Sequence, residues 1–136
     1  MSNFNKYFLI FFASSFLLLF TLGFIFLFIV TYSLDGVEYS KKNIFDYYFL
    51  TPSIIQNAPF ISNDAIYYSV GDDNYGFTRD KVTWEGVSNI SIAREKLEAY
   101  LKEQGIQKYS DDNTADKYLI VSYDHMISLE IIIPSR

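Results

Sequence analysis

The sequence of 136 residues contains no cysteine and a single histidine, His125. Without cysteine the chain cannot form disulfide bonds, thiol nucleophiles or cysteine-ligated zinc and iron–sulfur sites. His125 follows Asp124, but no G-x-S-x-G turn supplies a nucleophile for it. The phosphate-binding patterns G-x-x-x-x-G-K and G-x-G-x-x-G are also missing. We therefore predict a non-catalytic protein with no cofactor and no metal site.

Acidic residues are absent from the first 34 positions, where Lys6 is the one basic residue. The rest of the chain carries all 16 acidic residues and 10 of the 11 basic residues. Proteins that bind nucleic acid usually present clustered lysine and arginine, so we expect no nucleic-acid partner. Two acidic clusters, Asp72-Asp73-Asn74 and Asp111-Asp112-Asn113, lack the acid at the twelfth position of a calcium loop. We interpret both clusters as turns.

The main positive feature is the run from Tyr7 to Leu34, which contains no Asp, Glu, Lys or Arg. About 20 helical residues cross the roughly 30 Å hydrocarbon core of a bilayer, so we predict a transmembrane helix at residues 7–34 that contacts the lipid bilayer. The run exceeds the roughly 7 to 15 apolar residues of a cleaved signal peptide, and we expect it to remain as a signal anchor. Its hydroxyl groups should bond back to helix carbonyls. It has neither small residues four apart nor ionisable groups, which indicates a passive anchor.

Lysine counts do not decide the orientation of this helix, because Lys6 precedes it and Lys41 and Lys42 follow it. A short leader, one apolar helix and a larger following domain form the usual layout of an inner-membrane signal anchor. Abundant Phe, Tyr, Ile, Asn and Lys, which have AT-rich codons, indicate a bacterial or phage genome. We therefore predict a single-pass protein of the bacterial inner membrane. Its N-terminus would be cytoplasmic and its C-terminal domain periplasmic or otherwise extracytoplasmic.

We divide the chain into a short tail (residues 1–6), the anchor (7–34), a juxtamembrane connector (35–60) and a soluble domain (61–136). Residues 41–50 of the connector are rich in Phe and Tyr. Such rings favour the head-group region of a membrane. Two interpretations remain for this segment: it lies on the bilayer, or, as we favour, it packs into the domain as its first element. Thr51 and Pro52 are typical of a helix start and predict a short helix at 52–57.

The soluble domain has the pattern of two hairpins that flank a helix. Strands are predicted at 65–70 and 77–84, and again at 117–123 and 127–133. An apolar stripe with helical spacing predicts an amphipathic helix at 90–104; its members are Ile90, Ala93, Leu97, Tyr100 and Leu101. The result is an α+β fold, a small ββαββ-type domain with an antiparallel sheet and one amphipathic helix.

Local signals add detail to this fold. Ser88 or Ser91 should cap the helix at its start, and Gly105 should end it in a left-handed conformation. The apolar strand at 127–133 would be an aggregation-prone edge if it lay outermost. Alternation along that strand places Glu130 opposite Ile131, facing outward.

Aromatic residues are the one enriched group from which a binding surface can be predicted, since rings are favoured at interfaces. Adjacent strand residues such as Tyr67 and Tyr68 should point to opposite faces, and ordinary strand packing is the favoured alternative for these rings. The candidate surface comprises Tyr47, Tyr48, Tyr67, Tyr68, Tyr75 and Trp84.

The function predicted from these patterns is that of a membrane-anchored, non-catalytic envelope protein whose domain binds another protein. That partner, whose identity the sequence does not give, would be an assembly partner or a toxin that the domain inhibits. Two alternatives are an envelope module that binds sugar or lipid through exposed aromatic rings, and a small envelope enzyme of unrecognised type.

Overall fold

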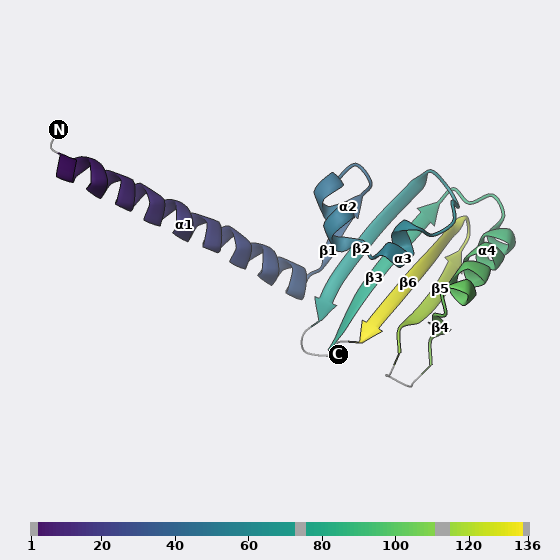
Figure 1. Ribbon diagram of the computed structural model, residues 1–136. Coiled ribbons are helices and arrows are strands. Elements are labelled where there is room, and N and C mark those ends of the chain that lie inside the picture. The colour runs from purple at the N-terminus through teal and green to yellow at the C-terminus, as the bar shows by residue number, and fades with distance from the viewer. Residues whose placement is uncertain (1–2, 73–75, 111–114, 135–136) are drawn as a thin grey trace.

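The computed structural model describes residues 3–72, 76–110 and 115–134. Within these residues, a long helix, α1 (Asn3–Leu34), projects away from an α+β domain with a six-stranded sheet (Figure 1). The domain contains, in chain order, β1 (Val37–Ser40), α2 (Ile44–Leu50), α3 (Ser53–Gln56), β2 (Asp64–Asp72), β3 (Phe77–Glu85), α4 (Ile90–Glu103), β4 (Gln107–Lys108), β5 (Lys117–Tyr123) and β6 (Met126–Pro134).

α1 is a continuous apolar helix in which two hydroxyl groups bond back to the helix backbone. The hydroxyls of Ser14 and Thr21 donate to the carbonyls of Phe11 and Leu17 at 2.9 Å each, as the sequence predicts. Asn5–Val30 is the one segment of the described residues that is long and apolar enough to cross a membrane, and its most apolar part has no buried residue. At 1.5 Å per residue its 26 residues extend about 39 Å, more than a hydrocarbon core requires.

The strands of the described residues are ordered β1-β2-β3-β6-β5-β4, and all neighbours are antiparallel except β4 and β5. The α+β class agrees with the prediction, but the ββαββ description omits β1 and β4. β1 comes from the segment that we interpreted as a connector and pairs with β2. β6 lies between β3 and β5, so both sides of this apolar strand are paired and it is not an edge.

The hydrophobic core lies between one face of the sheet and the helices α3 and α4. Alternate residues of the central strands point into it, as strand geometry requires. The most completely buried apolar side chains, each with no exposed surface, are Val82, Leu97, Leu101, Ile127 and Leu129. On the opposite face, Glu130 accepts a bond from Arg79, with Nε and Oε1 2.8 Å apart, which agrees with its predicted outward direction.

α4 shows why helix ends are harder to predict than helix faces. Its apolar stripe packs on the core as expected. The predicted serine cap is wrong, because Asn89 occupies the N-cap position and its Oδ1 accepts from the Ile92 N–H at 3.0 Å. At the other end Gly105 has φ +73° and the Ile106 N–H donates to the Leu101 carbonyl at 3.1 Å. This left-handed termination is the one predicted.

Residues 41–57 form two short helices that carry the chain from β1 to the core. Tyr47 and Leu50 of α2 pack against the core, so the interpretation of packing holds for these two residues. The next helix begins at Ser53, after Pro52. Thr51 does not cap it: this residue is buried, and its Oγ1 lies 3.0 Å from the Tyr39 Oη. Ile55 of α3 then enters the core.

Candidate functional site

The residues considered for catalysis are placed apart from one another. His125 lies exposed in the turn between β5 and β6, where its carbonyl accepts from the Val87 N–H at 2.8 Å. Glu130 is paired with Arg79 on the other face of the sheet. Among the described residues, no group of three or more His, Asp or Glu side chains is arranged to hold a metal ion. Of the two acidic clusters considered for calcium, only Asp72 lies within the described residues. Residues 73–74 and 111–113 lie outside them.

The predicted aromatic surface does not form a single patch. Tyr67 and Trp84 are 4% and 5% exposed and belong to the core, so strand packing, the favoured alternative, holds for these two rings and they are not part of an exposed surface. Tyr68 lies on the opposite face of the sheet from Tyr67, as alternation predicts, and is partly exposed. Tyr48 is 66% exposed on α2. Tyr75 lies outside the described residues.

Three tyrosines instead form a cluster that attaches α2 to the sheet. The ring of Tyr67 stacks on that of Tyr39, with centroids 5.8 Å apart. Tyr47 of α2 meets Tyr67 edge to face at 5.1 Å. Burial, together with the neighbouring hydroxyls of Tyr47 and Tyr39, raises the pKa of Tyr67 to about 12. The Tyr67 hydroxyl therefore stays protonated at neutral pH, and the ring acts in a packing contact.

A second buried polar group lies deeper in the sheet. Asp80 on β3 is 4% exposed, and its Oδ1 accepts a hydrogen bond from the Ser69 hydroxyl of β2. Burial raises the pKa of Asp80 to about 6, although the bond from Ser69 acts in the opposite direction. Sequence reasoning missed this residue. Alternation with Val82 and Trp84 is the signal that places it on the covered face of β3.

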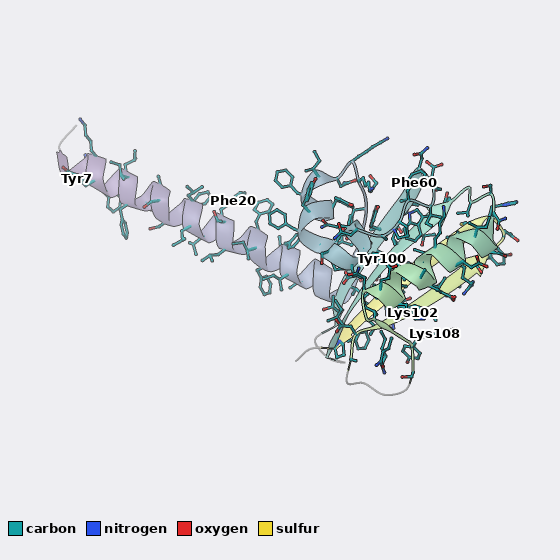
Figure 2. The ribbon with its side chains drawn as sticks, turned by 45° about the vertical axis from the view of Figure 1, so that its right-hand side comes forward. Tyr7, Phe20, Phe60, Tyr100, Lys102 and Lys108 are labelled. Atoms are coloured by element: carbon teal, nitrogen blue, oxygen red, sulfur yellow. The ribbon has the colours of Figure 1, made fainter. Side chains whose placement is uncertain are left out.

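The surface that sequence reasoning did not identify surrounds Phe60, in the loop between α3 and β2. Phe60 is 71% exposed and lies away from α1 (Figure 2). Its side chain borders two hollows of about 120 and 170 Å³. The first is lined in part by Ile55 and Trp84, and the second by residues at the start of α4, including Ile92, which is 50% exposed. We call Phe60, Ile92 and the two hollows the Phe60 patch.

The Phe60 patch combines exposed apolar side chains with two adjacent hollows. Apolar side chains that project beside hollows allow a partner to bury a ring and to insert side chains of its own. Pro59, which precedes Phe60, restricts the backbone φ angle at its own position in this loop. Comparisons with protein-family models, with curated proteins and with solved structures give no match for this chain.

Proposed function

We propose that the chain is a single-pass membrane-anchored protein whose α+β domain binds another protein outside the cytoplasm. The anchor is α1, and the observation that supports it is the exposure of its apolar side chains: Phe11, Leu19 and Phe26 are 70%, 69% and 66% exposed. A helix that is apolar on all sides and whose most apolar part is not buried within the protein needs an apolar environment, and a bilayer provides one.

The protein partner would bind at the Phe60 patch. An exposed aromatic ring beside preformed hollows is the kind of anchor that contributes most of the binding energy in protein interfaces. After α1 the chain carries 16 acidic and 10 basic residues. The charged residues that line the two hollows, however, are Lys41 and Lys96, which favours a partner with acidic groups at this patch. Sugar binding by stacked rings is a weaker alternative, because Tyr67 and Trp84 are buried in the core.

Protease accessibility tests the topology. The full chain, with an epitope tag at its C-terminus, is expressed in a Gram-negative bacterium and treated with protease in spheroplasts and after lysis. We expect loss of the tag in intact spheroplasts, because an extracytoplasmic domain is then accessible. Protection until lysis would contradict the proposed orientation.

Photo-crosslinking tests the partner site. A photoreactive phenylalanine analogue replaces Phe60 in one variant and Tyr123 in the control, since Tyr123 is also an exposed ring, at 70%, but lies at the end of β5. We expect a discrete crosslinked protein from position 60 alone, and Phe60→Ala should weaken binding of that protein by about tenfold or more. Equal crosslinking from both positions, or none from position 60, would contradict the Phe60 patch as the site.

A further inference from the structure

Helix α2 has two different faces. Tyr47 and Leu50 point toward the core. The other face leaves four large side chains in solvent: Ile44, Phe45, Tyr48 and Phe49 are 63%, 79%, 66% and 81% exposed. With about 100° between successive residues, these four lie within an arc of about 140°. We call them the α2 face. A dense exposed apolar face of this kind usually marks an interaction site.

The junction between α1 and the sheet places the α2 face beside the membrane helix. Two residues, Asp35 and Gly36, separate α1 from β1. The Tyr68 hydroxyl donates to the Asp35 carbonyl at 3.1 Å, which joins the end of α1 to β2. β1 then pairs with β2, and a turn closed by the Asn43 N–H and the Ser40 carbonyl at 3.0 Å leads back into α2. In both views α2 lies level with the C-terminal end of α1 (Figures 1 and 2).

We propose that α2 is an interfacial helix whose exposed face inserts into the head-group region of the bilayer that α1 crosses. The proposal rests on the membrane crossing proposed above for α1. Phe and Tyr rings and an aliphatic side chain on one face, with lysines beside them, are typical of helices that lie in a membrane interface. Lys42 is exposed two residues before α2, so its long side chain can reach lipid phosphates, whereas the Lys41 ammonium lies over the Tyr47 ring, 5.7 Å from its centroid.

A bilayer fits this face better than a protein partner because of where the face lies. Residue 44 follows the end of α1 by ten positions, so every copy of the chain that crosses a membrane brings α2 to the surface of that membrane. Insertion of α2 is then an intramolecular step. The anchor gives α2 a high effective concentration at the membrane surface, and no further partner is needed. A helix of seven residues could insert only weakly on its own, but the anchor removes the cost of association. The domain would thereby be attached at two points, which fixes its orientation on the membrane.

The absence of cysteine makes a direct depth measurement possible. Single cysteines are introduced into the full chain as Phe45→Cys, Phe49→Cys, Phe20→Cys and Lys102→Cys, and each carries an environment-sensitive fluorophore. Phe20 lies within the candidate span of α1, and Lys102 is exposed on α4 (Figure 2). The proteins are reconstituted into phosphatidylcholine vesicles that contain nitroxide lipids labelled at the head group or deep in the acyl chain.

We expect head-group nitroxide to quench the labels at 45 and 49 several-fold more than the label at 102, which aqueous iodide should quench instead. The label at 20 should respond to the deep nitroxide. If positions 45 and 49 behave like position 102, the inference is wrong even though α1 crosses. If position 20 also fails to respond, the membrane crossing itself is refuted and the inference with it. A third outcome is that the labels at 45 and 49 are quenched neither by iodide nor by nitroxide lipid. That result would show that protein covers the α2 face, and it would overturn the inference.

A second set of variants keeps the fold and removes the insertion. Phe45→Glu and Phe49→Glu are combined, with the fluorophore at Tyr48→Cys, because both substituted rings are exposed and take no part in the core. We expect quenching by head-group nitroxide at position 48 to fall to the level seen at 102, while the emission of the buried Trp84 stays unchanged. Undiminished quenching at 48 would refute a role for these rings in lipid contact.

Discussion

Asp80 should make the stability of the domain fall as the pH rises. Its carboxyl is 4% exposed within the sheet, and burial raises its pKa from 3.8 to about 6. The folded state therefore binds this proton more tightly than the unfolded state does. The stabilisation is complete below the unfolded pKa and is lost as the pH rises through the folded pKa. A difference of about two pKa units corresponds to roughly 3 kcal/mol in the free energy of unfolding.

The variant Asp80→Asn isolates this effect. Asparagine is nearly the same size, stays neutral and keeps a carbonyl oxygen that can accept the hydrogen bond from Ser69. We expect the variant and the native chain to be similarly stable near pH 4. Near pH 8 the variant should be more stable by up to about 3 kcal/mol, because it has no carboxylate to bury.

Trp84 provides the assay, since it is the sole tryptophan and is buried. Urea titrations of the full chain in detergent micelles, followed by its emission, give the free energy of unfolding of both proteins at each pH. The difference between the two proteins cancels the other titrating groups that they share. A difference that is the same at both pH values would refute the burial of an ionisable carboxyl at this position.

Three further substitutions test particular contacts in the same assay. Gly36→Ala should destabilise the domain by more than about 1 kcal/mol, because Gly36 has φ +70° and a Cβ there would lie 2.5 Å from the Tyr68 Oη. Gly105→Ala is its control, since Gly105 has φ +73° but open space around it, and an equal loss in both would exclude the steric clash. Asn89→Ala should cost about 1 kcal/mol through loss of the N-cap, whereas Ser88→Ala should cost little; the reverse order would favour a serine cap. Leu97→Ala should cost about 2 to 5 kcal/mol, because the side chain has no exposed surface, and a smaller loss would mean that the core collapses around the gap.

Much of the candidate site was beyond prediction from the sequence. Adjacent rings such as Tyr67 and Tyr68 must point to opposite faces, but the pattern does not say which face the helices cover. Packing of Tyr39 and Tyr47 on Tyr67 decides that it is the buried one. Phe60 carries no periodic signal, because it lies in a loop and its exposure depends on the elements around it.

Edge strands were missed for a related reason. β1 and β4 contain four and two residues, too few to show an alternating pattern, and they exist as strands because β2 and β5 offer unpaired backbone groups. The position of β6 between β3 and β5 likewise results from long-range pairing. The composition of β6 alone does not indicate which strands will pair with it.

The elements that could be predicted from the sequence are those whose cause is local. The length and apolarity of α1, the helical stripe and glycine stop of α4, and the hairpin of β5 and β6 all follow from neighbouring residues. Which side chains of those elements are buried and which are exposed depends on long-range packing. Residues 41–50 show the difference most directly: their composition fits both a packed and a lipid-facing helix. The docking of Tyr47 and Leu50 on the core turns Phe45 and Phe49 outward, because opposite faces of one short helix cannot both be buried against the same sheet.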